Sequence, residues 1–442
     1  MKISYLKIIG LFLVFLFFSS ITITSFSYFK DEETIAAKTE IDESTEDETD
    51  KILEIINKVN ESMLYDYLEE LSVNIGPRKA GTSGCEKAAK FIFNEFEKMG
   101  LETRYQHFES WTPRHKRYYK SKNIEATLPG TGTNSNEILV INAHYDTVKD
   151  APGAIDDGAG VVSVMTAAYV LSQYEFNRTI KFVTFSAEEV GLLGSRAYVN
   201  EIYDEDPEIL VELNLDGTGY ATTARHGKNL VLYPTKDAHW MCDEIRYINN
   251  YYNQDFNIIQ HQDIQPGGPR TYTSDFYDFV KHGYEAIAFG GTDSYPYWHT
   301  PEDTIDKVNF SILTRTVKII SASLAHLADI EVVHPQIQIV APKRGRLYFE
   351  DVTKKHFEYA RTVVIDDFLI RAYVKPGDAP IERVDFFYDG NKVFTDTDKP
   401  YQWRLNKISI KEHTVKVVLY DTEGRTAEDQ VTFTYINLLR RK

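Results

Sequence analysis

The chain carries histidines and paired carboxylates whose types and spacing suit a metal site. The candidate groups are His144, Asp146, the pair Asp156-Asp157, the pair Glu188-Glu189, Asp216 and His299. Imidazole and carboxylate side chains both bind divalent metals, and zinc accepts the two together. The Asp156-Asp157 pair lies in a glycine-rich turn, APGAIDDGAG, at residues 151–160. Taken alone it means little, because Asp-Gly is also ordinary turn chemistry.

Most of these candidates directly follow a predicted buried strand. Short apolar runs occur at 138–141, 181–185, 209–215 and 286–289, and helical patterns separate them. This alternation predicts an α/β fold with a mixed central β-sheet flanked by helices. Ligands bind such sheets at the carboxyl ends of the strands, so the candidates are expected to meet at one edge. After His299, Thr300-Pro301 is predicted to be the N-cap and first turn of a helix.

Acidic pairs elsewhere in the chain lack this context. Asp366-Asp367 lies in a predicted strand with no glycine after it, Glu32-Glu33 in an acidic segment, and Glu69-Glu70 on a predicted helix. The pairing alone therefore indicates no site. Five such features in order, each near a strand end, do indicate one. Two divalent ions would need one carboxylate that bridges them and a base that takes a proton from water.

Helices are predicted at 51–73, 84–99 and 161–171 from apolar residues at helical spacing. The chain has only two cysteines, Cys85 and Cys242, so no disulfide framework is visible. The two could pair in an oxidising compartment. Cys85 falls on the apolar face of the second predicted helix, which favours a buried free thiol.

The first fifty residues differ in composition from the rest of the chain. Two lysines precede an uncharged run at 8–29 that is long enough to span a bilayer. Residues 1–29 are predicted to be a signal peptide or a signal anchor, and both alternatives stay open, because Ser25-Phe26-Ser27 would suit cleavage. Residues 30–50 are strongly acidic and are predicted to be a disordered stalk. The body of the protein is therefore expected outside the cytoplasm, either secreted or membrane-anchored.

The net charge of −17 argues against a nucleic-acid partner, because a polyanion would be repelled. From residue 333 the chain shows short alternating strands and no helical pattern, and Asp389-Gly390-Asn391 predicts a tight hairpin. The motifs Ile381-Glu-Arg-Val-Asp-Phe-Phe-Tyr-Asp-Gly, Lys399-Pro-Tyr-Gln-Trp and His413-Thr-Val-Lys-Val-Val-Leu-Tyr-Asp resemble those of bacterial immunoglobulin-like modules. Residues 333–442 are therefore predicted to be a small all-β sandwich. A spacer role or contact with a cell wall or surface is the expected role of this part.

Together the motifs resemble those of the zinc aminopeptidases of family M28, the co-catalytic dizinc exopeptidases. The resemblance covers roughly residues 55–330. It rests on Gly76-Pro-Arg-Lys-Ala-Gly-Thr-Ser-Gly, His144-Tyr-Asp, Ile155-Asp-Asp-Gly-Ala-Gly, Ser186-Ala-Glu-Glu-Val-Gly, Asn214-Leu-Asp and His299-Thr-Pro-Glu-Asp-Thr. It implies a dizinc peptidase domain at 51–332 with a zinc-exopeptidase-like fold and a peptide substrate.

The resemblance implies five metal ligands. They are His144 and Asp216 for one zinc, Glu189 and His299 for the other, and Asp156 as the bridge between the two. It also implies that the peptide bond after Asp156 is cis. Manganese and cobalt suit the same ligands, so the native metal stays open.

The resemblance also implies two catalytic residues. Glu188 would be the general base that takes a proton from water and passes it to the leaving amine, and Asp146 would orient the His144 ring. In many relatives a tyrosine precedes the last histidine ligand, but here Trp298 stands at that position. The group that assists in polarising the scissile carbonyl therefore stays open, as does the preferred side chain of the substrate.

Several alternatives remain at the level of the sequence. A glutaminyl cyclase would use a single zinc and typically lacks the acidic pair before glycine. A relative of the M20 peptidases would need an inserted lid domain, for which the 82 residues between Asp216 and His299 leave little room. A non-catalytic binding ectodomain would be expected to have lost ligands. The sequence does not separate an aminopeptidase from a carboxypeptidase or a dipeptidase.

Overall fold

The computed structural model describes residues 43–113, 115–205, 208–264, 274–332, 334–349, 351–356 and 361–438. The predicted signal or anchor segment and most of the acidic stalk lie outside these residues. The helices are α2 (Glu43–Lys58), α3 (Glu61–Glu69), α4 (Ser83–Lys98), α5 (Ala159–Leu171), α6 (Leu193–Glu205), α7 (His239–Tyr251), α8 (Phe276–Lys281) and α9 (Phe310–Asp329).

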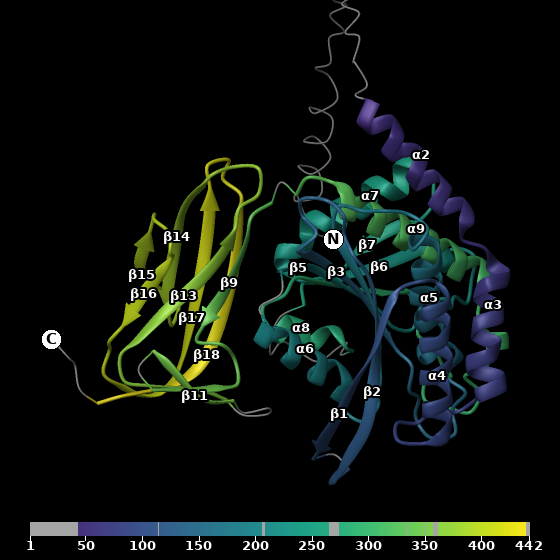
Figure 1. Cartoon of the computed structure of the whole chain (residues 1–442), viewed down its shortest axis with the longest axis horizontal. Coiled ribbons are helices and arrows are strands. Elements are labelled where there is room, and N and C mark those ends of the chain that lie inside the picture. Colours follow the sequence, from purple (N-terminus) through teal and green to yellow (C-terminus); the bar gives the residue numbers. More distant parts are fainter. Residues whose placement is uncertain are drawn as a thin grey trace, which may run out of the picture. The chain divides into compact units, whose positions relative to one another are not determined.

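Eight strands form a central mixed sheet, in the order β1-β2-β4-β3-β5-β8-β6-β7 (Figure 1). Their bounds are β1 (Glu102–Thr112), β2 (Arg117–Leu128), β3 (Glu137–His144), β4 (Thr179–Phe185), β5 (Glu208–Leu215), β6 (Asn229–Pro234), β7 (Asn257–Gln260) and β8 (Ala286–Gly290). The middle strands β4, β3, β5 and β8 run parallel to one another, whereas β2 joins β4 and β6 joins β8 in antiparallel pairs. The α/β architecture and its mixed sheet are thus as predicted.

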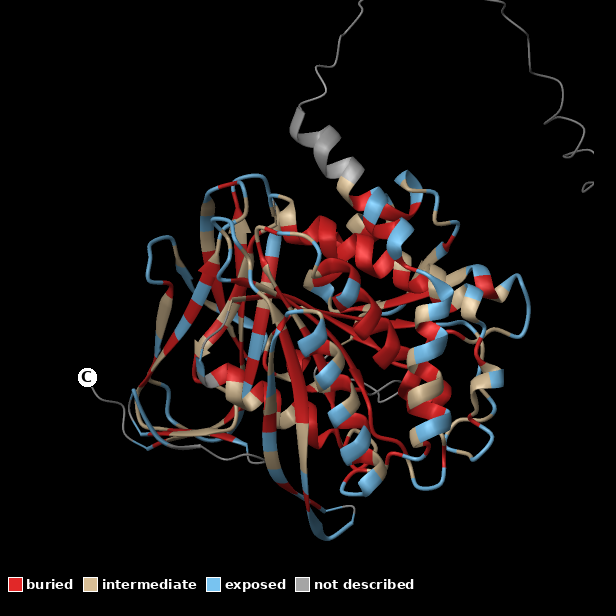
Figure 2. Ribbon diagram, turned by 45° about the vertical axis from the view of Figure 1, so that its right-hand side comes forward, coloured by how far each residue is buried: buried red, intermediate tan, exposed pale blue. Residues whose placement is uncertain are grey.

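Helices cover both faces of this sheet. On one face, α4, α5, α7 and α9 enclose the main hydrophobic core, into which Leu139 and Ile141 of β3 point. On the other face, α6 and α8 pack on Val140 of the same strand. A strand that is covered on both sides is apolar at successive positions, which is why β3 was recognisable as a continuous apolar run. Figure 2 shows these central strands buried along their length.

The predicted helices 84–99 and 161–171 correspond to α4 and α5. The predicted helix 51–73 is divided, because the Asn60 side chain caps α3 by accepting a hydrogen bond from the Met63 N–H at 3.0 Å. A π-helical turn, Glu70–Ile75, follows α3. Both cysteines, Cys85 and Cys242, are buried and free.

The predicted helix N-cap at Thr300-Pro301 is wrong. Residues 300–304 form a turn, and a single 3₁₀ turn follows at Ile305–Lys307. The α-helix α9 begins only at Phe310, where the Asn309 side chain accepts a hydrogen bond from the Ile312 N–H at 3.1 Å. The nearby carboxylate of Asp303 instead binds a segment 148 residues earlier in the chain. Sequence patterns report local capping and cannot reveal such a distant partner.

One helical stretch among the described residues, Ala154–Leu171, is long and apolar enough to cross a membrane. Within the fold it is 94% buried, as expected for the core helix α5 of a globular domain.

After α9, all the secondary-structure elements in the described residues are strands. These are β9 (Gln336–Ala341), β10 (Arg346–Phe349), β11 (Val352–His356), β12 (Thr362–Ile365), β13 (Phe368–Lys375), β14 (Ile381–Tyr388), β15 (Asn391–Asp396), β16 (Gln402–Leu405), β17 (Ser409–Asp421) and β18 (Thr426–Asn437). They form a seven-stranded sheet, β11-β10-β12-β18-β17-β14-β15, and a three-stranded sheet, β16-β13-β9. One apolar core, which includes Phe368, Phe386 and Phe433, joins the two sheets.

The hairpin predicted at Asp389-Gly390 is present between β14 and β15, and both residues have positive φ angles of 50° and 78°. That geometry is the reason for Asp-Gly at this position. The strand predicted through Asp366-Asp367 is wrong, because the pair lies in the turn between β12 and β13 and Asp366 has a φ of 71°. An immunoglobulin-like identity for this all-β part stays a prediction.

Replacement of Phe96 by alanine is expected to lower the free energy of unfolding by about 3–5 kcal/mol, because this fully buried ring of α4 would leave a cavity. Lys90→Ala on the exposed face of the same helix should change it by less than about 0.5 kcal/mol. The shift of the urea midpoint, followed by circular dichroism, measures both. Equal shifts would contradict the placement of α4 against the core.

Candidate metal centre

The five predicted ligands come together at the carboxyl edge of the central sheet. His144 ends β3, opposite Phe185 at the end of β4, and the loop after β4 carries Glu188-Glu189. Asp216 follows the end of β5, the neighbour of β3 on its other side. The parallel register of these three strands places their carboxyl ends at one level, as the rule for open α/β sheets requires.

The ligands form two groups that share Asp156. His144, Asp156 and Asp216 form the first group, and Asp156, Glu189 and His299 form the second. The Oδ1 atom of Asp156 lies 3.3 Å from His144 Nε2, and its Oδ2 atom lies 3.2 Å from His299 Nε2. Asp156 thus offers one carboxylate oxygen to each group, which is the arrangement a bridging ligand requires.

The spacing of the donor atoms fits a divalent ion. A tetrahedral ion with bonds of about 2.0–2.1 Å holds its ligand atoms roughly 3.3 Å apart. His299 Nε2 lies 3.2 Å from Glu189 Oε2, and His144 Nε2 lies 4.0 Å from Asp216 Oδ1. The second oxygen of Glu189 is buried and has no hydrogen-bond partner among the described residues. A buried carboxylate oxygen without a donor is costly unless a cation or water satisfies it.

The electrostatics of the site also favour a cation. Hydrogen bonds to Asp156 and Glu189 raise the pKa of His299 to about 10. Burial alone would lower the pKa of His144, but its contact with Asp156 and the charge of Glu188 outweigh burial and raise it well above the usual value. The field that holds a proton on both rings equally attracts a metal ion placed between these groups.

The Asp156–Asp157 peptide bond is cis, as the resemblance implied. The two carboxylates point to different partners. Asp157 Oδ1 accepts from the N–H groups of Gly160 and Gly217, and Oδ2 accepts from the His144 N–H. Asp157 therefore joins the end of β3, the start of α5 and the loop after β5, which fixes the segment that carries Asp156. Only glycine fits at Gly160, because a Cβ there would lie 2.4 Å from both Asp157 oxygens.

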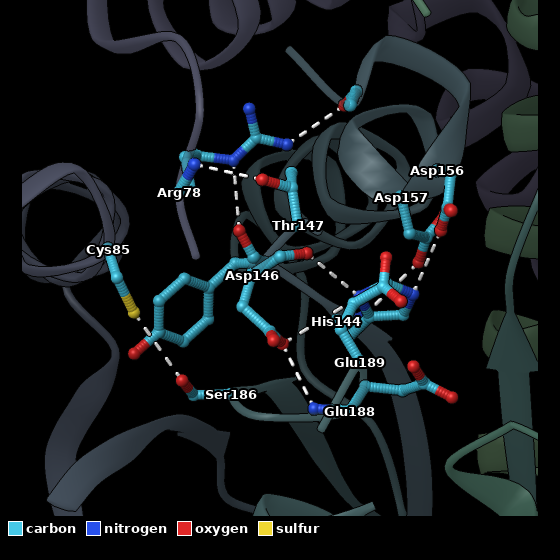
Figure 3. Close-up of polar contacts among 12 residues, drawn as sticks. Arg78, Cys85, His144, Asp146, Thr147, Asp156, Asp157, Ser186, Glu188 and Glu189 are labelled. Carbon is cyan, nitrogen blue, oxygen red and sulfur yellow. Dashed lines mark hydrogen bonds and ion pairs between the residues drawn. The ribbon is translucent and has the colours of Figure 1, made fainter. Parts of the chain in front are cut away.

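Glu188 and Asp146 differ in their placement. Glu188 lines the same cavity as the five ligands, and burial raises its pKa well above the usual value. The Asp146 carboxylate accepts from the Glu188 N–H at 3.0 Å, whereas its Oδ1 lies 3.8 Å from His144 Nδ1 (Figure 3). The closer contact to that ring nitrogen comes from the Asp146 main-chain carbonyl, at 3.1 Å. Asp146 thus contacts both the predicted base and the predicted ligand.

Arg78 holds the loop at 145–153, which connects β3 to Asp156, and it was not singled out from the sequence. Its side chain is fully buried and donates to five main-chain carbonyls, those of Leu71, Gly76, Tyr145, Pro152 and Gly153. Its own N–H donates to Thr147 Oγ1 at 2.9 Å (Figure 3). Burial lowers the pKa of Arg78 to about 10, so the guanidinium stays charged at neutral pH. This one cation ties the turn at 71–76 to both ends of the loop that connects β3 to Asp156.

Asp303 is a second positioning residue that the sequence did not reveal. Its Oδ1 accepts from the Ile155 N–H at 2.9 Å and from the Tyr295 hydroxyl at 2.6 Å, and its Oδ2 accepts from the Asp156 N–H at 3.1 Å. The segment that carries His299 therefore binds the main chain of Asp156 directly, through Asp303. The Tyr295 hydroxyl is thus engaged by the same carboxylate that holds Asp156.

A cavity of about 370 Å³ opens onto the metal centre. Besides the ligands and Glu188 it is lined by Gly191, Leu192, Arg196, Tyr277 and Trp298. Trp298 lies against Gly217, where a Cβ would be 2.8 Å from its ring. Tyr277 and Arg196 were not anticipated, because their spacing along α8 and α6 carries no motif. Ser274 and Asp275 are both fully buried, and the charge of Asp275 contributes to the raised pKa of Glu188.

Residues 123–324 match the model of Peptidase family M28. Among curated proteins, the chain is 28% identical over 222 residues to the probable leucine aminopeptidase 2 of Trichophyton verrucosum, covering 45% of this chain and 43% of that protein. It is 26% identical over 247 residues to the aminopeptidase YwaD of Bacillus subtilis, covering 52% of this chain and 50% of that protein. The chain thus spans about half the length of these curated relatives.

Two solved structures share the fold. The zinc aminopeptidase BSAP from Bacillus subtilis superimposes with a TM-score of 0.53 at 18% identity, over 62% of this chain and 96% of that chain. A glutaminyl cyclase from Porphyromonas gingivalis superimposes with a TM-score of 0.52 at 19% identity, over 61% and 99%. The fold and the clustered ligands define the class of mixed α/β proteins that carry a metal site at the carboxyl edge of the sheet. Within this class, the chain is similar to peptidase family M28 over residues 123–324.

Asp303→Asn is expected to weaken zinc binding by about 10- to 100-fold. The carboxylate now accepts hydrogen bonds from two main-chain N–H groups, and the NH₂ of an asparagine could not accept one of them. Competition with a chelating dye measures the affinity. Glu302→Gln is the matched control, since it makes the same chemical change at an exposed neighbouring residue. Equal affinities of the two variants would refute the role of Asp303 as a clamp.

Arg78→Met is expected to lower the free energy of unfolding by at least about 3 kcal/mol, because several buried carbonyls would lose their donor. Arg78→Lys should lose less, since it keeps the charge but can reach fewer acceptors. Urea midpoints measure both, with Lys87→Met on the exposed face of α4 as the control. A midpoint for Arg78→Met that matches the control would disprove the role.

Proposed function

We propose that the protein is a metal-dependent aminopeptidase that removes N-terminal residues from peptides by means of two zinc ions. The observation that carries the proposal is Asp156, whose two oxygens face two separate groups of ligands. The names of the curated relatives, leucine aminopeptidase 2 and aminopeptidase YwaD, support a substrate with a free N-terminus. The shared fold with BSAP, a zinc aminopeptidase, supports zinc as the metal.

Zinc, when bound, acts as a Lewis acid that polarises a carbonyl and makes water a stronger acid near neutral pH. Glu188 supplies the proton transfer: it accepts a proton from the attacking water and donates it to the leaving amine. The hydrogen bond from the Glu188 N–H to Asp146 holds the loop after β4 against the end of β3. Leu192, Tyr277 and Trp298 give the cavity an apolar wall for the side chain of the N-terminal residue.

A glutaminyl cyclase is the second candidate, because a solved cyclase shares the fold. The two activities differ in the number of metal ions that the resemblance implies, two for the aminopeptidase and one for the cyclase. The shared carboxylate of Asp156 supports the aminopeptidase. Two equivalents of tightly bound zinc would favour it, whereas one equivalent with cyclisation of N-terminal glutamine would favour the cyclase.

We propose an extracytoplasmic location for the same reasons of composition given above: an uncharged segment at 8–29 and an acidic segment at 30–50. The all-β part after α9 would then serve as a spacer or as a contact with a cell wall or surface.

The full-length chain is expected to hydrolyse a panel of aminoacyl 4-nitroanilides, and a chelator should abolish the hydrolysis while zinc restores it. The same treatment should lower the melting temperature, because the carboxylates around His144 would repel one another without a bound cation. Absorbance and metal analysis of the purified protein check both effects. Hydrolysis that survives metal removal would refute the proposal, and a protein that takes up no zinc would favour a binding ectodomain.

Glu188→Gln is expected to reduce kcat by at least about 100-fold, because the amide cannot accept the proton. The variant should retain its zinc, since Glu188 belongs to neither group of ligands. Glu201→Gln, at a half-exposed position of α6 that pairs with Arg104 of β1, is the matched control for the chemical change. An active Glu188→Gln variant would disprove the assigned role.

A further inference from the structure

The β1–β2 hairpin extends past the carboxyl edge of the central sheet (Figure 1). Pairing between β2 and β4 begins at Ile124, so residues 117–122 of β2 pair with β1 alone. Six residues of extended strand correspond to about 20 Å. The tip therefore projects beyond the edge at which the metal ligands lie, and Figure 2 shows it largely exposed.

The hairpin is attached to the loop that carries Glu188 and Glu189. Tyr119 and Phe108 pack with Ala187, Val190 and Leu193 in one small apolar cluster. The Oγ1 atom of Thr112, the last residue of β1, is 3.8 Å from the position of a Cβ on Gly191, and Gly191 lines the cavity. Thr112 and Arg117, which pairs with it, thus lie near the rim of this cavity.

The tip is strongly basic in a chain of net charge −17. Residues 115–122, HKRYYKSK, include four lysines and arginines and no acidic residue. Lys116, Arg117 and Lys120 are exposed. Lys120 approaches Glu109 at 3.0 Å, but both side chains are open to solvent, so this pair contributes little. A local positive field of this kind attracts anionic groups over about 10 Å at moderate salt.

Two exposed aromatic rings accompany these cations. Trp111 and Tyr118 lie directly opposite each other in the hairpin, with ring centroids 5.3 Å apart, and are 39% and 61% exposed. The Arg117 guanidinium lies over the Tyr119 ring at 4.2 Å. We call Trp111, Lys116, Arg117, Tyr118 and Lys120 the basic tip.

We propose that the basic tip binds acidic residues of the peptide substrate downstream of the scissile bond. The inference rests on the proposed function, because it requires a peptide whose N-terminus occupies the cavity and whose chain leaves the cavity on the side of the hairpin. An extended peptide advances about 3.3–3.6 Å per residue, so the third to sixth residues after the bond can reach the tip. The basic tip would then give acidic peptides an advantage that the net charge of the whole chain opposes.

The test compares kcat/KM for three peptides, Leu-Ala-Ala followed by three glutamates, three glutamines or three lysines, each with an amidated C-terminus. We expect the full-length enzyme to prefer the glutamate peptide over the glutamine peptide by about fivefold at low salt. The preference should vanish at high salt, because the Debye length falls from about 20 Å at 0.02 M to about 4 Å at 0.5 M. A wild-type ratio near one at low salt would overturn the proposal.

The combined variant Lys116→Gln, Arg117→Gln and Lys120→Gln should bring the ratio to about one. A matched variant, Lys354→Gln, Lys407→Gln and Lys411→Gln, removes the same charge from exposed positions of the all-β part and should keep the wild-type ratio. Because each ratio compares two substrates of one preparation, partial unfolding of a variant does not affect it. A ratio that persists in the first variant would overturn the proposal.

Two further measurements separate the other outcomes. Hydrolysis of leucine 4-nitroanilide, which is too short to reach the tip, reports the proposed function by itself. If it fails, calorimetric binding of the same peptides with a reduced first bond decides whether the tip distinguishes them. Sedimentation with phosphatidylglycerol vesicles tests an anionic membrane instead: vesicle binding that needs the basic tip, together with a peptide ratio near one, would overturn the proposal in favour of a membrane surface.

Discussion

The concentration of negative charge at one edge of the sheet is the constraint on which the rest of this domain depends. Carboxylates from the ends of three strands converge on two imidazoles, and burial makes their mutual repulsion expensive. The fold tolerates this because the backbone that carries them is held from outside the cluster. Asp157 accepts hydrogen bonds from three main-chain N–H groups, and Asp303 accepts from two. Arg78 donates to five main-chain carbonyls. The ligands are therefore positioned by groups that bind no metal themselves.

The sequence was sufficient to predict which side chains meet at this edge of the sheet, but not which residues hold them in place. His144, Asp216 and the Glu188-Glu189 pair follow apolar runs, and the geometry of parallel strands predicts where such residues meet. Arg78 and Asp303 could not be found in this way, because they bind segments 67 to 148 residues away. A long-range hydrogen bond to a main-chain group leaves no trace in the local pattern, since any residue type offers the same N–H or carbonyl.

The same limit explains the local errors. Thr300-Pro301 has the composition of a helix start, yet its neighbour Asp303 is committed to Ile155 and Asp156, and the helix begins at Phe310. Asp366-Asp367 has strand neighbours on both sides, but a positive φ at Asp366 makes it a turn. The hairpin at Asp389-Gly390 was predicted correctly because both of its central residues need the left-handed region, which is a local property. The backbone conformation that a single residue requires can be predicted from the sequence, whereas the distant residues that a side chain contacts in the fold cannot.

The hydrogen bonds from Ile155 and Asp156 to Asp303 have a further consequence for how the molecule matures. Ribosomes make a protein from its N-terminus, so the bridging aspartate is synthesised long before the carboxylate that holds it. A nascent chain or a truncated fragment that ends before residue 299 contains four of the five ligands but neither His299 nor Asp303. Such an intermediate would have no complete second group and no clamp on the bridge. The two groups of ligands can therefore be completed only when nearly the whole α/β part has been made and folded.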